Sequence, residues 1–157
     1  MTGAVRLSCS ERVRACEVGR WSVDHLSTIL TARGVRVLDG PSNPRDDLVL
    51  SIDRAPEISG ASGGGPGAES FRIDRSEAGP DGESLTTVTI TGAGSRGLSY
   101  AVLELADIVE YSDEPIEAMR AVATGEHRPT TPIRSVLRTM VSEVQDLTWY
   151  HDRDFWR

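Results

Sequence analysis

The sequence predicts an α/β (α+β) domain with a mixed or largely antiparallel sheet of about four to five strands and two main helices packed on one face. Short runs in which apolar and polar residues alternate indicate the strands. Two longer stretches repeat apolar residues at helical spacing, so that one side of each helix is apolar. The elements follow one another roughly as β-α-β-β-β-α. A single sheet with its helices on one face would bury both apolar helix sides.

The first half of the chain supplies three strands and one helix. "AVRLSC" (Ala4–Cys9) is a short alternating strand, "VRVLDG" is a strand closed by a turn, and "DDLVLSID" (Asp46–Asp53) is a third strand. The helix lies within Glu11–Arg33, and its clearest part is "WSVDHLSTILTARG". We expect Ser22 to cap this helix and Gly34 to follow it as a left-handed residue.

The second half is expected to add a hairpin and two helices. "SFRID" and "SLTTVTIT" flank Gly-Pro and Asp-Gly dipeptides, which mark a turn between two strands. The Gly- and Ser-rich run Ser59–Glu69 should be a mobile loop, and it has no Lys for a phosphate-binding P-loop. One helix should follow Gly97, and a shorter one should be capped by Asp113 and ended by Gly125.

The composition limits which partners and which cellular location are expected. The net charge of −7 over 157 residues repels nucleic acid and anionic membranes, so neither is expected as a partner. The N-terminus has no apolar core of a signal peptide, and no stretch is long enough to span a membrane. We therefore expect a cytoplasmic location. The spacing of Cys9 and Cys16 fits neither a redox motif nor a zinc site, so both are interpreted as small core residues.

A glycine motif stands at the start of the helix after "TVTIT". Gly92, Gly94 and Gly97 have the G-x-G-x-x-G spacing of a dinucleotide-binding turn, with a strand before them and a helix after. No parallel strand follows that helix in the predicted order, and so no acidic residue is available for a ribose. We interpret the glycines as a sharp turn and a closely packed helix start, and expect no cofactor. The alternative, a nucleotide-cofactor protein, stays open.

A few other side chains are candidates for chemistry. They are His25, His127, the pair Glu143 and Asp146, and the group His151, Asp152 and Asp154. The last group could suggest a metal site, but it fits the solvated start of a helix capped by an aspartate better. Nothing in the sequence places a partner beside the others. No catalytic and no metal-binding residue is therefore assigned.

One stretch resembles a known family. "VTITGAGSRGLSYAVLELADIV" is similar to the last strand and helix of the N-terminal, non-catalytic domain of bacterial β-N-acetylhexosaminidases and α-glucuronidases, whose helix begins "G-x-x-Y-A/G-x-x-x-L". Here Gly97, Tyr100, Ala101 and Leu105 occupy those positions. The resemblance implies a domain of this type over residues 1–126.

A second stretch extends the resemblance over residues 127–157. After a proline-containing link, "SVLRTMVSEV" resembles the first strand of the (β/α)8 barrel of such enzymes, and "DRDFW" resembles the start of the next helix. Arg138 is the nearest match to a sugar-binding arginine of that barrel. The resemblance places the catalytic acids further along a barrel that needs about 250 residues. We therefore expect no catalysis by this chain, although a full-length parent would be a glycoside hydrolase.

The expected function is that of a non-catalytic accessory domain in carbohydrate metabolism. Its partner would be the catalytic barrel of a parent protein, and a carbohydrate is a possible ligand. The alternative from the interaction class is self-association through an apolar C-terminal tail. The apolar tail residues are Val136, Leu137, Met140, Val141, Trp149, Phe155 and Trp156.

Overall fold

The computed structural model describes residues 3–40, 43, 46–55, 66–77, 85–130 and 154. The strands are β1 (Ala4–Cys9), β2 (Arg36–Asp39), β3 (Leu48–Arg54), β4 (Phe71–Glu77), β5 (Thr86–Gly92) and β6 (Gly125–His127). The helices are α1 (Glu11–Arg14), α2 (Glu17–Ala32), the short 3-10 helix η1 (Pro66–Glu69), α3 (Ser95–Tyr111) and α4 (Pro115–Arg120).

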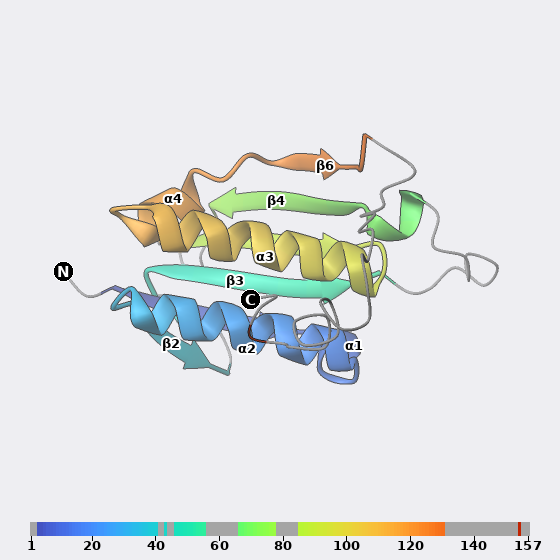
Figure 1. Ribbon diagram of the computed structural model, residues 1–157. Helices are drawn as coiled ribbons and strands as arrows, with labels where there is room; N and C mark the ends of the chain where they lie inside the picture. The colour runs from blue at the N-terminus through green and yellow to red at the C-terminus, as the bar shows by residue number, and fades with distance from the viewer. Residues whose placement is uncertain are drawn as a thin grey trace, which may run out of the picture.

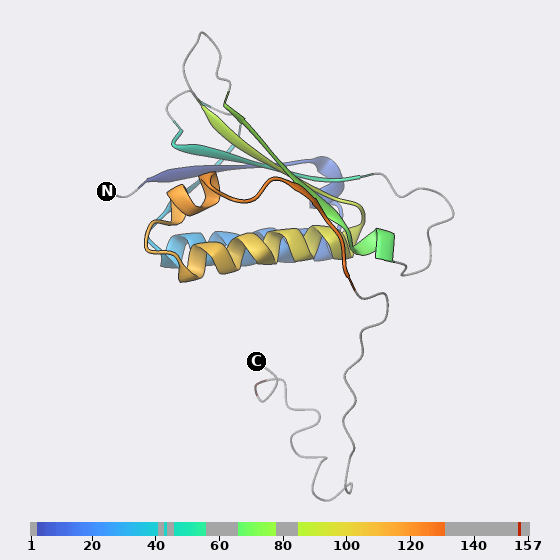
Figure 2. The ribbon, with the colours of Figure 1, turned by 90° about the horizontal axis from the view of Figure 1, so that it is seen from above.

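The strands form one mixed sheet in the order β2-β1-β3-β5-β4-β6 (Figure 1). The first four are parallel to one another, and β4 is antiparallel to both of its neighbours. The helices α2 and α3 lie side by side on one face of the sheet, as the view from above also shows (Figure 2). The predicted fold class is confirmed. The sheet has one strand more than the four to five predicted, because Gly125–His127 form the edge strand β6.

The core lies between the sheet and the two long helices. Alternation along β1, β3 and β5 turns their apolar side chains toward the helical layer, as the sequence indicated. Each long helix buries one side against these strands. The main core side chains are Val5, Leu7, Leu26, Leu30, Leu48, Leu50, Ile52, Ile73, Val88, Ile90, Leu98, Val102 and Leu105.

The hairpin prediction is confirmed. Strands β4 and β5 pair antiparallel, from Phe71 opposite Gly92 to Glu77 opposite Thr86. Of the Gly-rich run expected to be a loop, the described part, Pro66–Glu69, forms η1 directly before β4. This places η1 beside the turn that leads from β5 into α3.

The helix after β1 begins earlier than the sequence suggested. The predicted cap Ser22 lies inside α2, fully buried, and its hydroxyl donates to the Val18 carbonyl at 2.8 Å. The residue that precedes the helix is Cys16. Serine is a favoured N-cap residue, but a serine hydroxyl inside a helix can also bond to the carbonyl four residues back. The cap prediction was wrong for that reason.

The predicted helix endings have mixed outcomes. Gly34 follows α2 with φ of 75°, and the Val35 N–H donates to the Leu30 carbonyl at 2.9 Å, which closes the helix as predicted. The shorter helix α4 has Glu114 at its N-cap position, so the predicted cap Asp113 was wrong. The helix ends at Arg120. Gly125, expected at the end of α4, opens β6 instead.

Candidate functional site

The carboxyl ends of the four parallel strands meet at one edge of the sheet. β1 ends at Cys9, β2 at Asp39, β3 at Arg54 and β5 at Gly92. In open α/β sheets, ligands bind in the crevice outside this edge, where the strand order reverses. Here the chain passes from β1 to β2 on one side and then to β3 on the other. The side chains at this edge therefore form the candidate site.

The glycine motif at this edge has a packing cause. A Cβ on Gly92 would lie 2.3 Å from the backbone N of Leu98. A Cβ on Gly97 would lie 2.1 Å from the carbonyl O of Ser70. Both distances are shorter than any real contact of a Cβ, and both involve backbone atoms that cannot rotate away. Two of the three glycines are therefore required by the protein's own backbone.

The third glycine faces η1. A Cβ on Gly94 would lie 3.1 Å from the Ala68 carbonyl O, and the neighbouring Ala93 N–H donates to the Ser70 carbonyl at 2.9 Å. One backbone N–H of the turn is thus used within the protein. These contacts support the interpretation of the motif as a closely packed turn, while the expected lack of a cofactor stays a prediction.

Three polar side chains gather beside this turn. The Sγ of Cys16, which precedes α2, lies 3.5 Å from the Oγ of Ser95, the first residue of α3. The Cys16 thiol donates to this Oγ, and an Nη of Arg54 donates to the same Oγ at 3.2 Å. The hydrogen bond with Ser95, the backbone N–H groups of the α2 start and the Arg54 charge lower the pKa of Cys16.

The two thiols are expected to differ in reactivity. Burial raises the pKa of Cys9, whereas the pKa of Cys16 is lowered. Because the thiolate is the nucleophile, iodoacetamide at pH 8 should alkylate Cys16 several-fold faster than Cys9, as followed by peptide mass spectrometry. The substitution Ser95→Ala should slow the labelling of Cys16 and leave Cys9 unchanged. Equal rates for both thiols would contradict the assigned environments.

A pocket of about 470 Å³ lies on the other side of β1. It opens between the carboxyl ends of β1 and β2 and the first half of α2, with α1 at its border. We call it the Arg14–Arg20 pocket. Its lining residues are Cys9, Val13, Arg14, Arg20, Val23, Asp24, Asp39 and Gly40.

The charges of this pocket are balanced but not paired. In the described part of the chain, its two arginines and two aspartates take part in no ion pair. An Nη of Arg20 donates to the Arg14 carbonyl at 3.0 Å, which holds Arg20 toward α1. Burial raises the pKa of Cys9, while the nearby charge of Arg14 lowers it and that of Asp39 raises it further.

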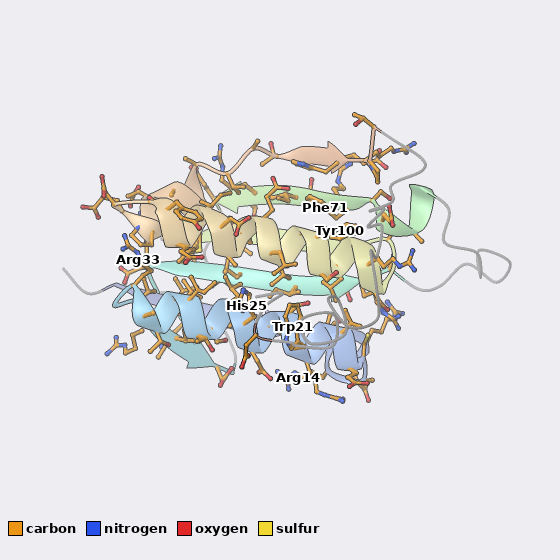
Figure 3. The ribbon with its side chains drawn as sticks, in the orientation of Figure 1. Arg14, Trp21, His25, Arg33, Phe71 and Tyr100 are labelled. Carbon is orange, nitrogen blue, oxygen red and sulfur yellow. The ribbon has the colours of Figure 1, made fainter. Side chains whose placement is uncertain are left out.

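The two described histidines have partners that the sequence did not show. His25 on α2 stacks on Trp21, with ring centroids 5.4 Å apart (Figure 3). His127 on β6 stacks on Phe71 at 4.6 Å, and its Nδ1 lies 3.8 Å from a carboxylate oxygen of Glu104. Both contacts are explained by packing at the surface of the helical layer and at the sheet edge.

The remaining sequence candidates lie almost wholly outside the described residues. These are Arg138, Glu143, Asp146, His151 and Asp152, as well as the apolar tail residues from Val136 to Trp156. Asp154 is described and exposed. Over the described ranges, no group of three side chains could hold a metal ion. No described helix is long and apolar enough to cross a bilayer.

The sequence did not identify the charged residues of the pocket. Its arginines are scattered along the chain, and only the parallel pairing of β1 with β2 brings Asp39 close to α1 and α2. The spacing of Arg20 and Asp24, four residues apart on one helix, was the one available signal. It indicates a shared helix face and says nothing of a pocket.

The comparisons with known proteins bear on the fold. The sequence matches no protein-family model and no curated protein. Among solved structures, the chain is similar to part of a GH138 enzyme targeting pectin rhamnogalacturonan II, with a TM-score of 0.55 and 13% sequence identity. The similarity covers 97% of this chain and 16% of that enzyme's chain. The chain therefore has a fold that resembles one domain of a glycoside hydrolase.

Proposed function

We propose that this chain is a non-catalytic accessory domain of a glycoside hydrolase-like protein with a role in carbohydrate metabolism. The supporting observation is that almost the whole chain matches a small part of a much longer glycoside hydrolase. Fold alone does not determine function, so the site must agree. The glycines of the turn from β5 to α3 are explained by backbone contacts, which removes the main sequence argument for a nucleotide cofactor.

We further propose that the domain is of the hexosaminidase and α-glucuronidase N-terminal type. The positions that match the family pattern lie on α3, and three of the four pack closely in the fold. Gly97 lets α3 approach Ser70, while Ala101 and Leu105 are fully buried against the sheet. Tyr100 is 39% exposed on the outer side of α3.

The outer side of the helical layer is the surface we assign to the catalytic barrel. Trp21 of α2 and Tyr100 of α3, both labelled in Figure 3, are 54% and 39% exposed, and Val18 of α2 is 41% exposed. Aromatic side chains of this kind are enriched in protein interfaces. A domain that supports a barrel needs such a surface, and exposed apolar side chains from two neighbouring helices would provide it.

The test compares the full chain with a chain that ends at Thr130. We expect both to unfold at the same urea midpoint, because all six strands of the described sheet precede Thr130, and neither to hydrolyse aryl glycosides, including aryl uronides. A lower midpoint for the shorter chain would show that residues 131–157 belong to this domain and would contradict the boundary near residue 126. Hydrolysis lost upon a substitution among the described residues would contradict the non-catalytic role.

A further inference from the structure

The Arg14–Arg20 pocket has features of a ligand site that the accessory role does not require. We propose that it binds an acidic sugar, a pyranose that bears a carboxylate. The proposal rests on four charged side chains around one cavity that form no ion pair within the described residues, on the apolar residues that line it, and on its size. It goes beyond the proposed function, because a supporting domain could do without the pocket.

The two arginines provide recognition of the carboxylate. A guanidinium is planar and offers parallel N–H donors that match the two oxygens of a carboxylate. Arg20 is held toward the α1 backbone by its bond to the Arg14 carbonyl, so both side chains border the same cavity. Neither arginine is engaged by an aspartate or glutamate among the described residues, which leaves both charges available.

The two aspartates provide recognition of hydroxyl groups. An ionised carboxylate only accepts hydrogen bonds, and a sugar presents several O–H donors at once. Asp24 comes from α2 and Asp39 from the end of β2, so they border the cavity from different elements. An inorganic anion would be repelled by both aspartates, and a neutral sugar would offer the two guanidinium charges no anion. A carboxylated sugar uses all four groups.

The apolar lining suits one face of a pyranose ring. Val13 is 1% exposed, and the half-buried Val23 and Cys9 line the same cavity. The C–H groups of a sugar ring can lie on such a surface while its hydroxyls reach the polar rim. The volume of about 470 Å³ is within the range of small-molecule sites, about 300 to 1,000 Å³.

The experiment is isothermal titration calorimetry of the full chain with sodium D-glucuronate and D-galacturonate. D-Glucose and D-galactose serve as the matched neutral sugars, and L-glutamate serves as a carboxylate without hydroxyls. We expect at least one uronate to bind with a dissociation constant on the order of 1 mM or tighter. The neutral sugars and glutamate should bind at least about tenfold more weakly, since a lost charge-assisted hydrogen bond reduces affinity by about that factor or more.

Matched variants locate the binding. Arg20→Gln should weaken uronate binding by about 10- to 100-fold. Arg12→Gln removes the same charge from α1 at an exposed position that does not line the pocket, and it should change the affinity less than about twofold. Circular dichroism melting confirms that both variants are folded.

Each other outcome overturns the proposal. Equal affinities for the uronate and the neutral sugar would show that the arginines do not recognise a carboxylate. Binding of glutamate at the affinity of the uronate would assign the pocket to acidic amino acids. No uronate binding, or binding that Arg20→Gln leaves intact, would show that the pocket does not serve this ligand class.

Discussion

Gly97→Ala is expected to destabilise the domain by about 1 to 3 kcal/mol in urea unfolding. The new methyl group would lie 2.1 Å from the Ser70 carbonyl O and 3.0 Å from its carbonyl carbon. Alanine gains about 1 kcal/mol over glycine as a helix former. Overpacking against a fixed backbone costs more than that gain, because the start of α3 must move away from the segment between η1 and β4.

The damage should extend beyond one contact. The Ser70 carbonyl that the new methyl group meets also accepts the Ala93 N–H at 2.9 Å, so displacing it strains the turn before α3. The matched control is Gly67→Ala, in the same η1 segment, where a Cβ would meet no atom of the described residues within 4 Å. That substitution should change the free energy of unfolding by no more than about 0.5 kcal/mol.

This pair of variants also tests the cause of the glycine motif. The destabilisation by Gly97→Ala must appear without any added nucleotide if the motif exists for packing. A stable Gly97→Ala protein that had lost affinity for NAD or FAD would instead support the cofactor interpretation. Thermal melting with and without each dinucleotide separates the two, because a ligand that binds the native state raises its melting temperature.

The turn illustrates what the sequence could and could not predict. Alternation in "TVTIT", followed by glycines and an apolar helical pattern, predicted β5 and α3 correctly. The reason for Gly97 was not predictable in detail, because its contact is the Ser70 backbone on the far side of the hairpin. A sequence pattern reports the period of side chains along one element. It does not report which distant backbone comes close.

Strand pairing explains why the pocket was missed. The alternation of β1, β2 and β3 indicates strands but is the same for parallel and antiparallel neighbours. The pocket forms because β2 returns parallel to β1 after α2, so that both strands end at the same edge. Arg14, Arg20 and Asp39 meet only as a result of that topology. The apolar side of α2 was predictable from the sequence. The parallel pairing of β2 with β1 was not.

The second large effect is expected at the ion pair of Arg6 and Asp46. Both side chains are largely buried, at 12% and 4% exposed. The Arg6 guanidinium donates to both carboxylate oxygens, from Nε at 2.5 Å and from Nη2 at 2.9 Å, and the Asn43 N–H donates at 2.7 Å. Asp46→Asn should lower the free energy of unfolding by about 2 kcal/mol at pH 7, because an amide cannot accept the same set of charge-assisted bonds.

The effect of Asp46→Asn should depend on pH in a defined direction. The hydrogen bond from Arg6 lowers the pKa of Asp46 in the folded protein. The ionised carboxylate therefore stabilises the fold fully above the unfolded pKa of about 3.9, and this stabilisation is lost as the pH falls through the lower folded value. The difference between wild type and variant should shrink as the pH falls below about 4.

The control for Asp46→Asn is Asp74→Asn, which breaks an ion pair of the same type at the surface. Arg72 and Asp74 are 60% and 48% exposed, so solvent screens their attraction. Urea unfolding from pH 3 to pH 7 should show a much smaller effect for Asp74→Asn, which would assign the larger effect to burial. Equal effects of the two substitutions would mean that the bonds to Asp46 add no more stability than a surface contact. Such a result would contradict the expected stabilisation. The Asp46 pKa is lowered by bonds that β1 positions in the folded protein, and the unfolded chain lacks that geometry.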